Sequence, residues 1–142
     1  MGHDANCIFC KIVQGDLPCV KVFEDSLTLA FMDINPVGPG HVLIIPKAHA
    51  ADILSVPAEQ LQAVTASVQR VATACQAALQ PDGMNIMQAN GAVAGQTVFH
   101  LHFHVIPRWD ADQLRLHIEG GPSAESSDLA ALAQRLRSVL AD

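Results

Sequence analysis

The sequence feature that most constrains the fold is the segment His100-Leu101-His102-Phe103-His104, in which histidines alternate with apolar residues. Successive side chains of a β-strand point to opposite faces, so an extended segment would place three imidazoles on one face, roughly 6.6 Å apart. The apolar residues would point into a core, and a slip of one residue would bury the imidazoles instead. We therefore predict a strand over residues 98–107, with a core on one face and a site on the other.

Length and composition indicate a single folded domain over residues 1–142. Half of the residues are hydrophobic and 15% are charged, so the chain can build a core. The longest apolar runs are too short to cross a membrane, and the first residues do not resemble a signal peptide. The net charge is -6 and the basic residues do not cluster, whereas nucleic-acid binding usually needs a basic face. We expect a cytoplasmic protein that binds neither membranes nor nucleic acid.

The remaining pattern predicts an α+β fold, with about five strands in a mainly antiparallel sheet, one long central helix and a C-terminal helix. Apolar residues at three- and four-residue steps from Leu61 to Leu79 predict the long helix, with Ser55 as its capping residue. A short helix is expected to end at Gly15 in a left-handed cap. The other strands are expected at residues 20–23, 28–32, 41–45 and 84–88, and the C-terminal helix near residue 127.

Several ordinary roles compete for the three histidines. They could be surface or core residues, a three-histidine zinc site, or a pH-sensitive ribbon, although neighbours on one strand converge poorly on a tetrahedral ion. The regular alternation favours catalysis, because a neutral imidazole is a good nucleophile at phosphorus near pH 7. The preceding loop, residues 91–97, is rich in glycine and small polar residues and can bring N–H donors to the same phosphate. The pattern favours phosphoryl or nucleotidyl transfer through a histidine intermediate.

The cysteines do not suggest a secreted disulfide framework, because the four are few and unevenly spaced. Cys7 and Cys10 have the spacing of a metal knuckle or a redox pair. Cys19 and Cys75 are expected to be small core residues.

The histidine segment and its flanks resemble the signature of the histidine triad (HIT) superfamily, in which three histidines alternate with apolar residues. Gly95-Gln96-Thr97-Val98 before the segment and Pro107-Arg108 after it support the match. Blocks at residues 7–12, 30–34 and 40–47 resemble the family's other blocks, in the same order. The resemblance covers about residues 7–109 and leaves residues 110–142 as a C-terminal extension.

The resemblance implies a homodimer that binds purine nucleoside monophosphate derivatives and cleaves the bond from the α-phosphorus to a nitrogen or oxygen leaving group. His102 would be the nucleophile that becomes covalently nucleotidylated, and His104 would bind the α-phosphate. Gln96 and Thr97 would contact the phosphate or the leaving group, and His41 would support the triad. Members of the family need no metal for this chemistry.

The resemblance also implies a set of nucleotide-binding positions. Asp33 would accept hydrogen bonds from the ribose, although the same residue could simply cap a turn. Ala89 aligns with an Asn or Gln of many relatives, so the neighbouring Asn90 would have to turn inward to make that contact. The walls of the base pocket, some of which could equally be plain core, would be Ile8, Phe9, Ile34 and Leu43.

A structural zinc ion is the one cofactor that the resemblance implies. Bacterial members similar to this chain often hold it at positions that here are Cys7, Cys10, His49 and His100. Such an ion would tie the N-terminal segment to the histidine segment. A free dithiol and a redox pair are the alternatives, and we favour zinc.

Two other functions compete with hydrolysis of phosphoramidates or adenylated small molecules. Pro107-Arg108 is compatible with a dinucleoside polyphosphate hydrolase of the same superfamily. A non-catalytic nucleotide sensor would bind AMP but form no adduct at His102. In relatives the C-terminal region influences substrate preference across the dimer. Trp109 and His117 are therefore candidates for such an influence here.

Overall fold

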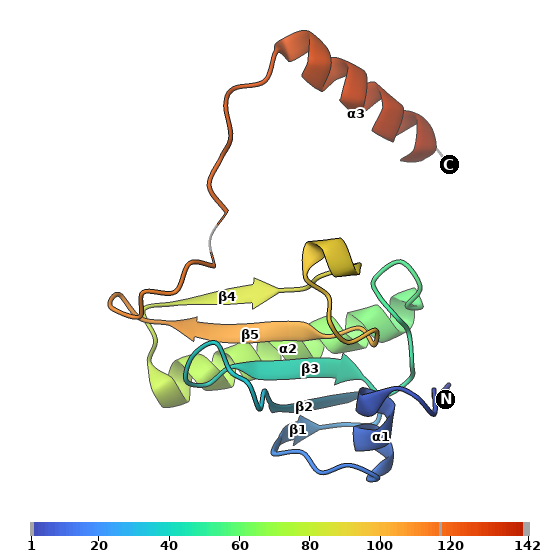
Figure 1. Cartoon of the computed structure of the whole chain (residues 1–142), viewed down its shortest axis with the longest axis vertical. Coiled ribbons are helices and arrows are strands. Elements are labelled where there is room, and N and C mark those ends of the chain that lie inside the picture. Colours follow the sequence, from blue (N-terminus) through green and yellow to red (C-terminus); the bar gives the residue numbers. More distant parts are fainter. Residues whose placement is uncertain (1, 117, 141–142) are drawn as a thin grey trace.

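The computed structural model describes residues 2–116 and 118–140 and has the predicted α+β fold. Within the described residues, one five-stranded sheet has the order β1-β2-β3-β5-β4, with all neighbouring strands antiparallel (Figure 1). The strands are β1 (Lys21–Glu24), β2 (Thr28–Met32), β3 (Val42–Pro46), β4 (Gly83–Met87) and β5 (Phe103–Arg108). The helices are α1 (Ile8–Gln14), α2 (Ala58–Leu79) and α3 (Ser126–Leu140), with a 3-10 turn at Ala92–Ala94.

Different helices cover the two faces of the sheet (Figure 1). Side chains along β2 and β3 alternate between these faces, as strand geometry requires. One set, which includes Ala30 and Ile44, packs against the buried stripe of α2. The other set, which includes Phe31 and Leu43, packs against Phe9 of α1. The sheet therefore separates two cores, and the histidine segment lies on the side of α1, where Phe9 contacts the rings of both His100 and His102.

The ends of the helices follow the predictions in one case and depart from them in another. Gly15 has φ +85° and its N–H donates to the carbonyl of Ile12, so the predicted left-handed cap of α1 is confirmed. The helix α2 begins after Pro57 without a side-chain cap. Ser55 is therefore not the capping residue, because its hydroxyl bonds to Asp52 in the preceding turn.

The strand that carries the histidines is shorter than predicted, because β5 begins only at Phe103. Its pairing with β3 ends at Ile44 and Phe103, although β3 continues to Pro46 beside β2. The N–H of Leu101 instead donates to the carbonyl of Ala50 at 2.7 Å. Of the three histidines only His104 lies on a regular strand, so the prediction of one strand over residues 98–107 is wrong. The alternation nevertheless persists, since Leu101 and Val105 are both fully buried.

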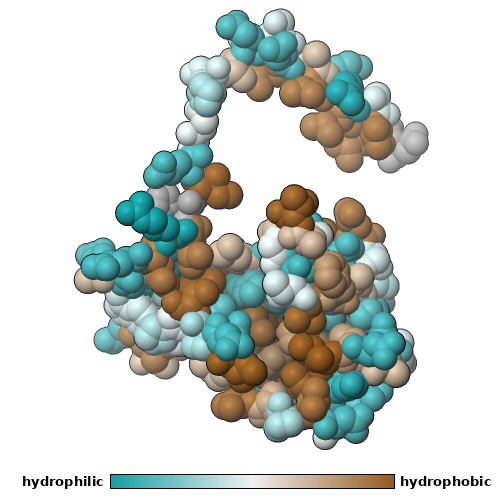
Figure 2. Space-filling view, in the orientation of Figure 1, coloured by the Kyte–Doolittle hydropathy of each residue, from teal (hydrophilic) through white to brown (hydrophobic). Residues whose placement is uncertain are grey.

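The C-terminal region extends away from the sheet (Figure 1). The described part of residues 109–125 contains no helix or strand, and His117 lies outside the described residues. No residue of α3 is buried. Its apolar side chains gather along one side of the helix (Figure 2). Among the described residues, no helix combines the length and apolar character needed to cross a membrane.

Replacement of Gly40 by alanine tests how tightly the loop between β2 and β3 is packed. Gly40 has φ +81°, and an added Cβ would lie 2.6 Å from Leu79 Cδ1 and 3.0 Å from Pro107 Cγ. Gly15 has a similar φ of +85° but no atom within 4 Å of its added Cβ. We expect Gly40→Ala to lower the free energy of unfolding by about 2–3 kcal/mol and Gly15→Ala by about 1 kcal/mol, measured by urea denaturation. Equal losses would contradict the packing argument.

Candidate functional site

A cavity of about 370 Å³ opens on the side of the sheet that carries α1. It brings together most of the nucleotide-binding and catalytic residues predicted from the sequence: Ile8, Phe9, Asp33, Ile34, Leu43, Thr97, His102 and His104. Ile12, Pro18 and Cys19 also line it, and Cys19 packs against the core cluster around Phe9, in agreement with the prediction. A larger apolar groove of about 620 Å³ lies beside α2, but its lining offers no histidine or carboxylate. The smaller cavity is therefore the candidate site.

His102 is held in one orientation by a backbone carbonyl. Its Nδ1 lies 2.8 Å from the carbonyl oxygen of His100, so Nδ1 carries the ring proton and Nε2 keeps its lone pair. Phe9 packs edge-on against the ring, with centroids 5.3 Å apart. Burial lowers the pKa of His102, which favours the neutral form. A neutral imidazole with a free lone pair in a cavity has the chemistry of a nucleophile.

His104 and His41 form a second pair of rings behind His102. His104 lies on β5 and its ring centroid is 5.0 Å from that of His102. His41, just before β3, places Nε2 2.8 Å from His104 Nδ1. Burial lowers the pKa of His104 to about 4, with His102 and His41 acting in the same direction. His41 is not part of the cavity lining and contacts the site through His104.

Asp33 caps a turn and also lines the cavity. Its Oδ1 accepts the N–H of Asn35 at 2.8 Å, which caps the turn after β2. Its Oδ2 lies 3.6 Å from His41 Nε2. The carboxylate also lines the cavity. One oxygen therefore shapes the loop while the other faces the histidines.

Gln96 and Asn90 lie outside the cavity lining, in contrast to Thr97. Gln96 is buried, and its amide donates to the carbonyls of Ala51 and Val98 and accepts the N–H of Gly91. Asn90 accepts the N–H of Ile53 and pairs with Gln88. Both amides hold the loop that precedes the histidines against residues 51–53. Contact of either amide with a nucleotide would require these bonds to be exchanged.

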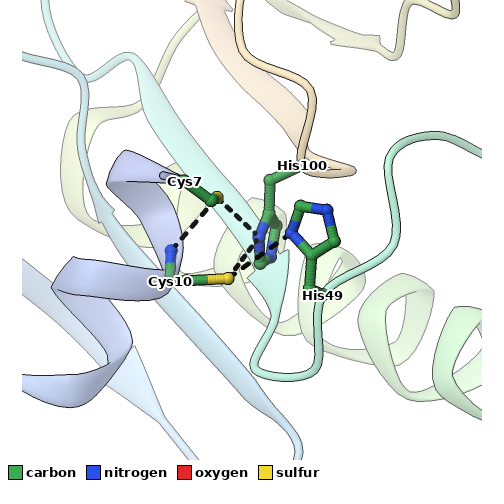
Figure 3. Close-up of side chains that lie close together, drawn as sticks. All are labelled: Cys7, Cys10, His49 and His100. Atoms are coloured by element: carbon green, nitrogen blue, oxygen red, sulfur yellow. Dashed lines mark hydrogen bonds between the residues drawn. The ribbon is translucent and has the colours of Figure 1, made fainter. Parts of the chain in front are cut away.

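Cys7, Cys10, His49 and His100 form a compact cluster next to the cavity (Figure 3). Cys7 Sγ lies 3.3 Å from His100 Nδ1, and Cys10 Sγ lies 3.4 Å from His49 Nδ1 and 3.5 Å from His100 Nδ1. In a tetrahedral zinc site, sulfur and nitrogen ligands are separated by about 3.6 Å. The donor set and its spacing therefore fit zinc, and the four residues could hold a metal ion.

The groups around the cluster orient its ligands. His100 Nε2 lies 2.8 Å from the carbonyl oxygen of Pro46, so it donates its proton there and leaves Nδ1 free as a ligand. His49 Nε2 lies 4.0 Å from Asp4 Oδ2. The N–H of Cys10 donates to Cys7 Sγ, and the N–H of Asp4 donates to Cys10 Sγ. Burial raises the pKa of Cys10 and outweighs the opposing effect of the Asp4 N–H, so a metal ion bound here would displace the thiol proton.

Comparison with known proteins agrees with this geometry. The family model described as HIT domain matches residues 14–111. The chain belongs to the HIT domain family. It is 47% identical over 103 residues to adenosine 5'-monophosphoramidase hnt1 of Schizosaccharomyces pombe, which covers 72% of this chain and 74% of that protein.

Solved structures of the family share the fold. A crystal structure of a HIT family member from Bacillus subtilis has a TM-score of 0.89 at 36% identity, and the match covers 94% of this chain and 96% of that one. A Zn-bound histidine triad family protein from Mycobacterium smegmatis has a TM-score of 0.74 at 41% identity, with 94% and 97% covered. The family and fold predicted from the sequence are thus confirmed.

The lowered pKa of His104 makes stability depend on pH. An unfolded histidine takes up a proton near pH 6.5, whereas folded His104 resists it until about 4. The stabilisation of the folded state by neutral His104 is therefore fully present above about pH 6.5 and is lost as the pH falls toward 4. Between pH 6.5 and 4 we expect the free energy of unfolding of the wild type to fall by on the order of 2 kcal/mol more than that of His104→Gln, measured by urea denaturation. The exposed control His3→Gln should follow the wild type, and parallel curves for all three proteins would contradict this cause.

Proposed function

We propose that this protein is a nucleotidyl hydrolase that cleaves purine nucleoside phosphoramidates or adenylated small molecules through a covalent nucleotidyl-histidine. The observation that carries the proposal is the free Nε2 lone pair of His102 in a cavity that also holds a carboxylate and a second imidazole. The relative named as an adenosine monophosphoramidase supports the same substrate class.

The reaction proceeds in two displacements at the α-phosphorus. The His102 Nε2 lone pair attacks phosphorus, and the bond from phosphorus to the leaving nitrogen or oxygen breaks as that atom takes a proton from solvent, which the hydrolytic water of the second step returns. Water then cleaves the new phosphorus–nitrogen bond, which releases a nucleoside monophosphate and restores the imidazole. His104 donates to the phosphate oxygens and Thr97 contacts the leaving group, so charge is stabilised by hydrogen bonds and no step needs a metal.

The rest of the cavity fits the nucleoside. Apolar side chains of α1 and of the neighbouring strands provide a wall for a planar base. Asp33, with one oxygen left over from its turn, accepts hydrogen bonds from the ribose hydroxyls. The lining of this cavity thus supports binding of a base, a sugar and the α-phosphorus beside His102.

The test is to trap the intermediate and map it. Adenosine 5'-phosphoramidate mixed with the enzyme and quenched in acid-free denaturant should give a nucleotidyl adduct on His102 by peptide mass mapping. His102→Asn should lose the adduct and reduce kcat/KM by about 10³-fold or more, because the nucleophile is gone. His3→Asn, an exposed histidine, is the control.

Three outcomes would each contradict one part of the proposal: the reaction, the substrate class or the nucleophile. AMP binding without any adduct or turnover would indicate a nucleotide sensor. A higher kcat/KM on diadenosine polyphosphates than on phosphoramidates would indicate a dinucleoside polyphosphate hydrolase. An adduct on a histidine other than His102 would overturn the assignment of the nucleophile.

We propose that the Cys–His cluster holds a structural zinc. Two thiols and two imidazole nitrogens at the spacings of a tetrahedral site support this, and so does the Zn-bound relative. All four ligands come from the protein, which is typical of a structural ion. The ion would fix α1, whose Phe9 and Ile8 line the cavity, to the histidine segment.

Metal content and its removal test the zinc site. Protein never exposed to chelator should contain about one zinc per chain, and removal of the metal should lower the melting temperature, because the ion stabilises only the folded cluster. Cys10→Ser should lose the metal. Cys75→Ser, which changes a buried cysteine of α2 outside the cluster, should keep it. Absence of metal in untreated wild-type protein would contradict the proposal.

We propose that the chain is a homodimer in which α3 contacts a second copy. The apolar side of α3 is exposed in the single chain and is formed by Leu129, Leu132, Leu136, Val139 and Leu140 (Figure 2). A stripe of this kind normally packs against a partner.

Light scattering should give about twice the chain mass of 15.1 kDa. The double variant Leu132→Glu with Leu136→Glu should weaken the dimer by placing charges on the apolar stripe. Ala131→Glu, which places a charge on the opposite, exposed side of α3, is the control. A monomer mass for the wild type would contradict the proposal, and an unweakened dimer in the double variant would exclude α3 from the interface.

A further inference from the structure

The loop between β2 and β3, residues 33–41, presents a backbone N–H to the far side of the His41 ring. The Val37 nitrogen lies 3.2 Å from His41 Nδ1 and is the donor. A backbone N–H can only donate, so Nδ1 must offer its lone pair. Neutral His41 therefore carries its ring proton on Nε2. Burial lowers the pKa of His41 and so favours this neutral form.

The proton on His41 Nε2 determines the state of the next ring. His41 Nε2 lies 2.8 Å from His104 Nδ1, so His104 accepts at Nδ1 and carries its own proton on Nε2. Asp33 Oδ2 lies 3.6 Å from the same His41 Nε2, and a carboxylate there also favours a proton on that nitrogen. The donors thus run in one direction, from the Val37 amide through His41 to His104.

His102 has the opposite arrangement. Its partner is a carbonyl oxygen, so Nδ1 holds the proton and Nε2 the lone pair. Two rings with centroids 5.0 Å apart consequently present different groups at Nε2, a lone pair on His102 and an N–H on His104. This difference comes from their hydrogen-bond partners and not from the residue type.

The loop holds the Val37 amide in place by several constraints. The N–H of Asp33 donates to the carbonyl of His41 at 3.1 Å and closes the base of the loop. Asp33 also accepts the N–H of Asn35. Pro36 fixes the backbone just before Val37, and Gly40 packs against Pro107 of β5.

We propose that the backbone amide of Val37 is a positioning group, which sets the direction of this hydrogen-bond chain and so makes His104 an N–H donor toward the phosphate of a bound nucleotide. Its catalytic consequence rests on the proposed function. The tautomers of His41 and His104 do not depend on that function, so an experiment can contradict either the hydrogen-bond chain or the proposed function without contradicting the other.

The first test needs no substrate. Nitrogen NMR of the ¹⁵N-labelled chain at pH 7.5 reports which nitrogen of each neutral imidazole is protonated. We expect an unprotonated Nδ1 and a protonated Nε2 for His41 and His104, and the reverse for His102. A protonated Nδ1 on His41 or His104 would overturn the proposal, whatever the activity of the protein.

A pair of variants tests the amide itself. Val37→Pro removes the N–H, whereas Val37→Ala keeps it. We expect Val37→Pro to give mixed tautomers at His41 and His104 and a kcat/KM for adenosine 5'-phosphoramidate about tenfold lower, the effect of one lost hydrogen bond. Val37→Ala should match the wild type in both measurements.

The outcomes are distinguishable. Unchanged tautomers in folded Val37→Pro would overturn the role of the amide, and if that variant does not fold, the wild-type spectrum decides. If the wild type shows the expected tautomers but turns over no substrate, the hydrogen-bond chain stands and the proposed function fails.

Discussion

One buried imidazole connects the three parts of the chain that form the site. His100 is fully buried; its Nε2 donates to the carbonyl of Pro46 at the end of β3, while its Nδ1 faces the thiols of Cys7 and Cys10. A buried polar ring without partners is costly, so this arrangement is stable only when α1, β3 and the histidine segment are all in place. The wall of the cavity and the Cys–His cluster are therefore assembled by the same interaction.

Neighbouring histidines differ because each has a different hydrogen-bond partner. His100 donates to a carbonyl from Nε2 and turns Nδ1 to the cysteines. His102 donates to a carbonyl from Nδ1 and leaves Nε2 to the cavity. His104 accepts at Nδ1 from His41. A single alternating motif thus presents three rings that differ in which nitrogen is free, because the hydrogen-bond partner of each ring decides which nitrogen carries the proton.

The sequence predicts which side chains face the core or the site better than it predicts which distant backbone groups those side chains bond. Alternation placed Leu101 and Val105 in the core and the histidines at a site, and Gly15 marked the end of α1, all from local periodicity and backbone preference. The early end of the β3–β5 ladder, the bonds of Gln96 to Ala51, and those of Asn90 to Ile53 depend on backbone groups far along the chain. No local pattern encodes those pairings, so an amide expected at the nucleotide holds a loop instead.

The residues that the structure describes include two groups of potential metal ligands, and the distances within each group indicate different chemistry. Asp33, His41 and His104 are close enough together to suggest a second metal site. The nitrogens of His41 and His104, however, are 2.8 Å apart, a hydrogen-bond distance shorter than the roughly 3.3 Å between two imidazole ligands of one tetrahedral ion. The Cys–His cluster has distances of 3.3–3.5 Å between sulfur and nitrogen, close to those of such an ion. The distances in the first group therefore fit a hydrogen-bonded network, and those in the second fit a site that could hold a metal ion.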